Sequence, residues 1–239
     1  MENIRMKRLI IFSLFVFLSW TITDTSAQRK TAAEETKQLQ VSKDATLIES
    51  PTGVLANSKG ETIFVGRTGQ PEGSKRRGLV AFDLTGIPPR SRIVSVTLTM
   101  TVQISANGDQ PSTITLYRVL KAWKEGTSVS QGGRGADATP GDPTWIHSVY
   151  PTQRWARPGG DYLNVLSAQT EVRNAGSYTW NSTPRLVADV QSWLNSPKRN
   201  FGWILIADES KAPTAKVFRS RESTEEAARP QLTVTFRRR

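Results

Sequence analysis

Residues 92–104, RIVSVTLTMTVQI, constrain the fold more than any other part of this 239-residue chain. Serine, threonine or glutamine fills the gaps between apolar residues at every second position: Val94, Val96, Leu98, Met100, Val102 and Ile104. A period of two gathers these side chains on one face of a β-strand, whereas a helix would spread them around its circumference. The stretch therefore predicts a long strand with one buried face, which a second sheet or a helix must cover.

From residue 44 onward the chain contains further, shorter segments that read as strands. Apolar runs alternate with clusters of glycine, proline, serine and asparagine, and these runs are 45–48, 62–65, 78–84, 112–120, 200–207, 215–218 and 231–236. Short strands separated by turn residues are typical of an all-β sandwich or barrel. We therefore predict a single antiparallel domain over residues 44–239.

One segment has helical rather than strand periodicity. Ser182 or Thr183 can cap it, and Pro184 suits a first helical turn. Apolar side chains then fall on one face at Leu186, Val187, Val190, Trp193 and Leu194. Asn195-Ser196-Pro197 ends the pattern, so we expect one short helix that packs this face against the sheet.

The N-terminus predicts export. Basic residues at positions 5, 7 and 8 precede an apolar run over 9–20, and Thr25-Ser26-Ala27 supplies small residues for cleavage. The run is too short to span about 30 Å of hydrocarbon as a helix, which favours a cleaved signal peptide (1–27) over an uncleaved anchor. Residues 28–43 are polar and mixed in charge, so we expect a flexible segment before the domain. The mature protein is then secreted, extracellular and free of the membrane.

Composition excludes several chemistries and suggests one kind of partner. The chain has no cysteine, which excludes disulfides, a lipoprotein anchor, thiolate zinc sites and cysteine nucleophiles. Without residues 1–27, 29 basic and 19 acidic residues give a formal charge of +10. Such a charge attracts polyanions, and export favours an acidic polysaccharide or cell-envelope glycan over nucleic acid. The alternative is that scattered lysines and arginines only keep the surface soluble.

The long connection over residues 127–165 holds the candidate binding residues. Loops of this length in compact domains are usually functional, and this one is rich in glycine and aromatic residues. Flat rings stack on sugar faces while polar groups bind the hydroxyls. The predicted carbohydrate-binding residues are Trp145, His147, Trp155, Arg157, Asp161 and Tyr162, with Asn164 nearby. The alternative is a covering loop with a core of its own; we favour burial for Trp145 and exposure for Trp155 and Tyr162.

Catalysis and metal binding have less support. His147 is the only histidine, so a polysaccharide-lyase-like mechanism would need it together with Tyr150 or Tyr162 and Arg157. The chain has no G-x-S-x-G, Walker or H-E-x-x-H motif. No cofactor is indicated with certainty, but oxygen ligands suited to calcium occur in the loops at Asn107, Asp109, Asp137, Asp142 and Asp161.

Several short motifs occur in an order that resembles the DNRLRE-domain family, secreted modules grouped with carbohydrate-binding module family ninety-six. The motifs are Phe82-Asp83-Leu84, the alternating strand, Ala122-Trp123-Lys124-Glu125-Gly126-Thr127, Trp193-Leu194, Asn200-Phe201-Gly202-Trp203, Ser220-Arg221-Glu222 and Arg229-Pro230-Gln231-Leu232. The resemblance implies a jelly-roll-like β-sandwich, extracellular placement, polysaccharide binding in some members and no catalytic residues. The long segment between Thr127 and Tyr178 departs from the family pattern.

The charged residues of these motifs predict structural ion pairs. Arg221 beside Glu222, with Arg229 close in sequence, can pair with a carboxylate such as Asp83 or Glu125. The alternative is a guanidinium that grips a substrate carboxylate.

Three functions are consistent with the sequence. The leading one is a secreted, non-catalytic carbohydrate-binding module for a polysaccharide, either acidic or neutral. The second is a structural or adhesive cell-envelope sandwich without a sugar site, and the third is a polysaccharide-lyase-like enzyme.

Overall fold

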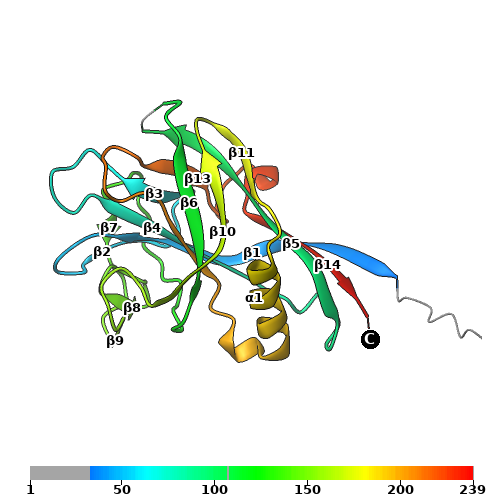
Figure 1. The fold of residues 1–239 in the computed structure, drawn as a ribbon. Coiled ribbons are helices and arrows are strands. Elements are labelled where there is room, and N and C mark those ends of the chain that lie inside the picture. The colour runs from blue at the N-terminus through cyan, green and yellow to red at the C-terminus, as the bar shows by residue number, and fades with distance from the viewer. Residues whose placement is uncertain (1–32, 107, 239) are drawn as a thin grey trace, which may run out of the picture. The chain divides into compact units, whose positions relative to one another are not determined.

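A computed structural model describes residues 33–106 and 108–238, so the predicted signal peptide lies outside the described residues. The strands are β1 (Glu34–Ile48), β2 (Leu55–Asn57), β3 (Thr62–Arg67), β4 (Lys75–Phe82), β5 (Arg92–Ser105), β6 (Ser112–Val119), β7 (Ala136–Asp137), β8 (His147–Val149), β9 (Gln153–Arg154), β10 (Tyr162–Val172), β11 (Gly176–Trp180), β12 (Trp203–Ile206), β13 (Lys216–Arg219) and β14 (Gln231–Arg237). The helical elements are α1 (Pro184–Asn195) and the 3-10 turns η1 (Pro197–Arg199) and η2 (Glu226–Ala228). The prediction of an all-β fold with one short α-helix is confirmed (Figure 1).

The strands form two antiparallel layers that share strands β1 and β3. One layer contains β11, β5, β14 and β13, and the other contains β10, β6, β12, β4, β2 and β7. The pairings β4–β3–β13–β5–β14–β1–β4 close a circuit, because β1 pairs first with β14 and then with β4 (Figure 1). Strands β1 and β3 take part in both layers and so join them, while β10, β11 and β7 remain as end strands.

The main core lies between the two layers. It includes the alternate residues Leu98 and Met100 of β5 together with Trp180, Trp203 and Phe218, all with 0% relative exposure. Helix α1 begins at the predicted place, where the Thr183 hydroxyl accepts a hydrogen bond from the Leu186 N–H at 3.0 Å. Its buried face carries Leu186, Val190 and Trp193. The ring centroid of Trp193 lies 4.5 Å from that of Trp203, so the helix packs directly on the core.

The two ends of β5 differ from the predicted alternation. Val96, Leu98, Met100 and Val102 are buried, but Val94 is 37% exposed and Ile104 is 55% exposed. Ser95 and Ile93 pair with consecutive residues of β14, and Ile104 and Val102 pair with consecutive residues of β13. Each bulge inserts one extra residue and reverses the face on which the following side chains lie. Ile93 therefore replaces Val94 in the core.

The expectation of a flexible segment over residues 28–43 is wrong from Glu34 onward. Residues 34–40 pair with β14 in unbroken antiparallel register, from Glu34 with Arg237 to Gln40 with Gln231. Leu39 and Val41 alternate with polar neighbours and reach the main core. Two inward apolar residues are enough to make this segment a strand because β14 supplies its backbone hydrogen bonds. The composition of residues 28–43 does not reveal that partner.

No helix within residues 33–106 and 108–238 is long and apolar enough to cross a lipid bilayer.

Candidate functional site

The long segment after Glu125 covers the outer face of the β1–β4–β12–β6 layer. There it builds a second apolar cluster in which Trp145 and Trp155 pack with Trp123, Leu79 and Ile204. Trp145 is buried, as expected. The expected exposure of Trp155 is wrong, because its side chain is 5% exposed and its Nε1 donates to the Thr144 carbonyl at 2.9 Å. Most of the segment is thus a covering layer.

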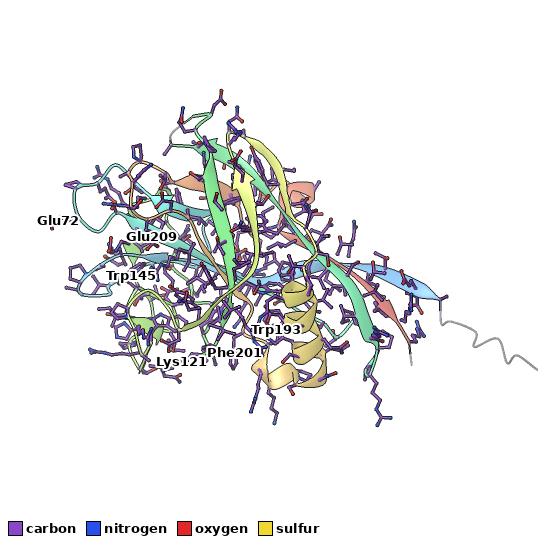
Figure 2. The ribbon with its side chains drawn as sticks, in the orientation of Figure 1. Glu72, Lys121, Trp145, Trp193, Phe201 and Glu209 are labelled. Atoms are coloured by element: carbon purple, nitrogen blue, oxygen red, sulfur yellow. The ribbon has the colours of Figure 1, made fainter. Side chains whose placement is uncertain are left out.

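The end of this layer forms an open surface pocket, here called the basic pocket, with a volume of about 670 Å³. It is lined by Arg77, Leu120, Lys121, Ala156, Arg157, Pro158, Gly160, Asp161, Tyr162 and Asn164. The structure therefore brings together three of the predicted binding residues, Arg157, Asp161 and Tyr162. Figure 2 shows Lys121 and Trp145 on the part of the domain away from helix α1.

The loop that closes this pocket depends on Gly159. Its φ of +86° lies in the left-handed region, and a Cβ there would stand 2.5 Å from an Arg77 nitrogen and 2.9 Å from the Trp145 ring. Any other residue would be strained and would collide with both groups. Gly159 instead places its carbonyl 2.8 Å from Arg77 Nη1, which anchors the loop.

Asp161, which lines the pocket, also shapes the loop that carries Arg157. Its carboxylate accepts hydrogen bonds from the backbone N–H groups of Ala156 at 2.9 Å and Arg157 at 3.1 Å. These bonds close the turn that carries Arg157, so the functional role of Asp161 is positioning.

Tyr162 provides the aromatic surface of the pocket. Its half-buried ring lies 5.2 Å from that of Tyr117, at an angle of 42°. Tyr162 of β10 pairs with Val119 of β6, and Leu166 pairs with Tyr117. Strand β10 therefore advances four residues while β6 advances two, so β10 contains two extra residues here. The extra residues loop outward, which leaves Asn164 exposed at the rim.

The three cations of the pocket have different partners. Arg77 makes two hydrogen bonds to the Glu209 carboxylate, at 2.7 and 2.8 Å, and lies 4.8 Å from the Trp145 ring centroid. Lys121 Nζ donates to the Arg154 carbonyl. The exposed Arg157 side chain has no hydrogen bond or ion pair with residues 33–106 or 108–238. Arg77 is thus neutralised, while Lys121 and Arg157 leave positive charge without a carboxylate partner.

Sequence reasoning missed Arg77, Leu120 and Lys121. No short motif marks them, since lysines and arginines are frequent throughout the chain. One sequence feature points indirectly to Arg77. Strand β4 is apolar on both faces from Gly78 to Phe82, which indicates that a second layer covers the sheet next to Arg77.

His147 lies apart from the pocket. The residue is 6% exposed, its Nδ1 is 3.1 Å from the Thr144 hydroxyl, and its ring meets the Tyr150 ring edge-on at 5.2 Å. Burial, assisted by the Arg154 charge, lowers the pKa of His147, although a hydrogen bond with the Gly53 backbone opposes this change. The arrangement is that of a packed histidine: Tyr150 lies beside the imidazole, but His147 is not among the residues that line the pocket with Arg157 and Tyr162.

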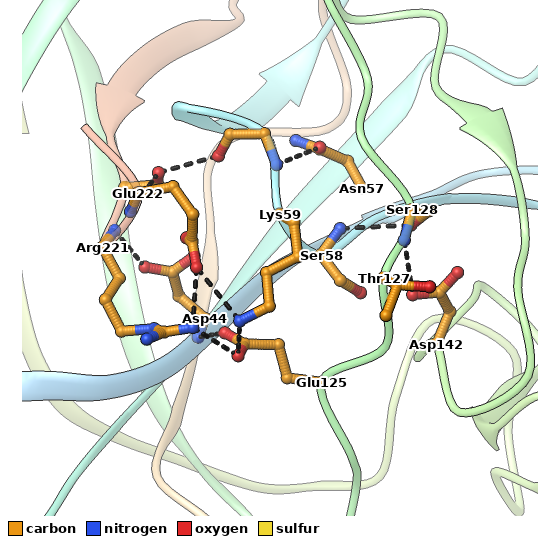
Figure 3. Close-up of polar contacts among 12 residues, drawn as sticks. Asp44, Asn57, Ser58, Lys59, Glu125, Thr127, Ser128, Asp142, Arg221 and Glu222 are labelled. Atoms are coloured by element: carbon orange, nitrogen blue, oxygen red, sulfur yellow. Dashed lines mark hydrogen bonds and ion pairs between the residues drawn. The ribbon is translucent and has the colours of Figure 1, made fainter. Parts of the chain in front are cut away.

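A second group of charged residues forms an ion cluster, shown in Figure 3. Arg221 Nη2 lies 2.7 Å from Glu125 and 2.6 Å from Glu222, so the structure brings these three predicted residues together. Lys59 Nζ contacts both carboxylates, and Asp44 accepts the Arg221 backbone N–H at 2.7 Å. Lys59 and Asp44 were not predicted, because neither lies in the motifs from which the ion pairs were inferred.

Two of the predicted ion-pair residues do not join the cluster. Asp83 is exposed, and its carboxylate accepts from the N–H and hydroxyl of Thr85 at 2.9 and 3.0 Å. Arg229 contacts the exposed Glu226 at 3.5 Å and donates to the Ser223 carbonyl. For Asp83, a hydrogen bond within its own turn competes successfully with a distant cation.

The candidate calcium ligands do not converge in the described part of the chain. Asp109 bonds Asn174, Asp142 bonds Thr139, and Asp161 closes its own turn, while Asn107 lies outside the described residues. Among residues 33–106 and 108–238, the only His, Asp and Glu group compact enough for one ion is Asp44, Glu125 and Glu222. The ammonium of Lys59 and the guanidinium of Arg221 already supply positive charge there.

The ion cluster predicts a pH dependence of stability through Asp44. Burial raises the pKa of this carboxyl well above its usual value of 3.8; the Arg221 N–H opposes the rise, and the Glu222 and Glu125 charges add to it. The folded state then binds more protons than the unfolded state, so this group lowers stability as pH rises through its folded pKa, by up to about 1.4 kcal/mol per pH unit.

We expect Asp44→Asn to remove this contribution and still accept the Arg221 N–H. Urea unfolding between about pH 4 and 8 should show a smaller decline of the unfolding free energy with pH in the variant. Identical slopes for the two proteins would contradict the prediction.

The fold and the pocket together define an all-β, sandwich-like domain whose long covering segment builds a basic surface pocket. No protein-family model matches the chain, and no curated protein sequence matches it. The resemblance to the DNRLRE-domain family stays a prediction from the sequence motifs.

Proposed function

We propose that this protein is a secreted, non-catalytic module that binds an acidic polysaccharide at the basic pocket. The single observation that carries the proposal is the side-by-side placement of Tyr162, Asn164 and the unpaired Arg157 in a pocket of about 670 Å³. A tyrosine ring offers an apolar face for sugar C–H groups, an amide binds hydroxyls, and a free guanidinium binds a carboxylate in a bidentate manner.

The balance of charge in the pocket favours an acidic sugar over a neutral one. Arg77 is paired with Glu209, whereas the Asp161 carboxylate keeps its one negative charge and accepts two backbone N–H groups of its own turn. Lys121 and Arg157 remain as cations facing the open pocket. The openness of the pocket to solvent suits a chain that passes across the surface, and the predicted export places the module where such chains occur.

A structural or adhesive envelope protein is the second candidate. The observation in its favour is that every tryptophan within residues 33–106 and 108–238 is buried, so none offers an exposed platform for a sugar. In that case the basic pocket has no specific ligand, and its charge acts only through general attraction to anionic polymers.

A single substitution separates the two candidates. Arg157→Ala removes an exposed side chain without partners, so the fold should be unaffected. If Arg157 binds a sugar carboxylate, affinity for polygalacturonate or alginate should fall about ten- to a hundredfold, because a charged hydrogen bond contributes about 1.5–3 kcal/mol. Affinity electrophoresis and calorimetry at physiological salt measure this change.

The matched control is Arg199→Ala, which removes the same charge from an exposed position outside the pocket. Specific binding predicts that this variant retains wild-type affinity. Equal weakening in both variants, together with complete loss of binding near 1 M salt, where the Debye length is about 3 Å, would leave only general electrostatic attraction.

A further inference from the structure

A second cavity, of about 610 Å³, lies between the end of strand β4 and helix α1. It shares no lining residue with the basic pocket. Along β4, Arg77 of the basic pocket and Phe82 of this cavity are five residues apart, a distance of about 17 Å in an extended strand. The two are therefore separate places on the domain.

The wall of this cavity is mainly apolar. Phe82, Leu84 and Ile87 come from the end of β4 and the turn after it, and Trp193 and Leu194 come from α1. Figure 2 shows Trp193 at this helix. Apolar walls around a volume of this size are typical of sites for small molecules.

Lys43 is the one cation among the residues that line the cavity. Its Nζ donates to the Trp123 carbonyl at 2.6 Å and lies 3.9 Å from the centroid of the Trp123 ring. It has no carboxylate within ion-pair distance among the described residues. Burial lowers the pKa of Lys43 to about 8, while the Glu125 charge opposes this, so the ammonium form still predominates at pH 7.

The acidic residue at the cavity is engaged elsewhere. The Asp83 carboxylate accepts from the Thr85 N–H and hydroxyl. Lys43 is therefore the charged group with capacity for a guest, since an ammonium has three donors and one carbonyl uses only one of them.

Two further polar atoms at the cavity wall have no partner within the described ranges. They are Nε1 of Trp193, a residue that is 2% exposed, and Oδ1 of Asn200, whose Nδ2 donates to the Phe82 carbonyl. A donor and an acceptor left without partners are unusual in a folded interior, but both atoms are buried beneath the wall and do not face the open cavity, so the proposal does not rest on them.

We propose that this cavity is a second ligand site, for a small amphipathic anion whose apolar body lies against Phe82, Leu84 and Leu194 and whose acidic head group binds Lys43. Charge complementarity selects the anion, because Lys43 is the one cation among the residues that line the cavity and its ammonium retains donors beyond the one used by the Trp123 carbonyl. This inference does not depend on polysaccharide binding at the basic pocket.

Two dyes that share an apolar body test the proposal. The anionic probe is 1-anilinonaphthalene-8-sulfonate, and the neutral one is N-phenyl-1-naphthylamine, which lacks the sulfonate. We expect saturable binding of one anionic dye per chain. Lys43→Met should weaken that binding about tenfold and change binding of the neutral dye less than about twofold, and Lys43→Arg should retain most of the anionic affinity.

Lys124→Met is the matched control, since Lys124 is exposed beside Trp123 and does not line the cavity. It should bind both dyes like the wild type. Unchanged anionic binding in Lys43→Met, equal loss in Lys124→Met, or binding that never saturates would each overturn the proposal.

A measurement on the unmodified protein covers the case in which Lys43→Met does not fold. The anionic dye should slow acetylation of the Lys43 amine by an activated acetyl ester, while acetylation of Lys124 continues at its usual rate. Peptide mass spectrometry reads both sites, and equal rates at Lys43 with and without the dye would also overturn the proposal.

Discussion

Met100→Asp should abolish folding of the domain. Met100 has 0% relative exposure, lies in the middle of β5 and belongs to the core between the two layers. An aspartate there would be an isolated charge with no cation beside it, or would have to be protonated at a cost of several kcal/mol. Together with the lost packing of the methionine, this penalty is comparable to a total stability of about 5–15 kcal/mol.

The neighbouring substitution Thr99→Asp is the control. Thr99 lies on the opposite face of the same strand, is half-buried, and shares a hydrogen bond of 3.0 Å with the Thr179 hydroxyl. Loss of that contact should lower the free energy of unfolding by about 1 kcal/mol, and the variant should remain folded. Circular dichroism and urea unfolding distinguish the outcomes; similar behaviour of the two variants would show that β5 is not buried on one side only.

The middle of β5 could be predicted from the sequence because a strict period of two has one simple structural solution. Its ends could not, because the bulges at Val94 and Gln103 arise from how β14 and β13 meet β5. Register depends on the partner strand, and only the folded chain provides it. The same reason explains β1, whose polar first half becomes a strand because β14 lies beside it.

The binding residues were predictable only as members of one loop. The sequence placed Arg157, Asp161 and Tyr162 together, and the structure confirms their proximity at the basic pocket. It could not show that Asp161 faces the backbone or that Trp155 turns inward, since proline, glycine and arginine neighbours do not determine the direction of a side chain. Burial of Trp155 follows from tertiary packing in the cluster that contains Leu79 and Ile204, and the hydrogen bond to the Thr144 carbonyl satisfies its indole N–H.

The ion cluster shows the same limit for charged residues. Arg221, Glu222 and Glu125 were expected to interact, and they do. Lys59 and Asp44 complete the cluster from strands and turns more than 60 residues away from Glu125 in sequence. Charge type is visible in a sequence, but the distance between two charges is a property of the fold.

Glu125→Ala should be the most damaging change in this cluster. The Glu125 carboxylate, whose side chain is 11% exposed, accepts from the Asp44 N–H at 2.8 Å, from Arg221 at 2.7 Å and from Lys59. Its removal leaves two cations to share Glu222 and leaves the Asp44 N–H without its partner. Breaking a buried pair from one side costs about 3–5 kcal/mol, and since both cations are about one-third exposed here, a loss of about 2–3 kcal/mol is expected.

Glu226→Ala is the control for the removal of a carboxylate from a guanidinium pair. Glu226 is 82% exposed and lies 3.5 Å from Arg229, so its loss should change stability by less than about 0.5 kcal/mol. Urea unfolding with an unchanged m-value would assign both effects to the free energy of the folded state. A loss for Glu125→Ala no larger than that for Glu226→Ala would contradict this prediction. It would mean that solvent already screens the cluster, so that the contacts of Arg221 and Lys59 with Glu125 contribute little to the free energy of unfolding.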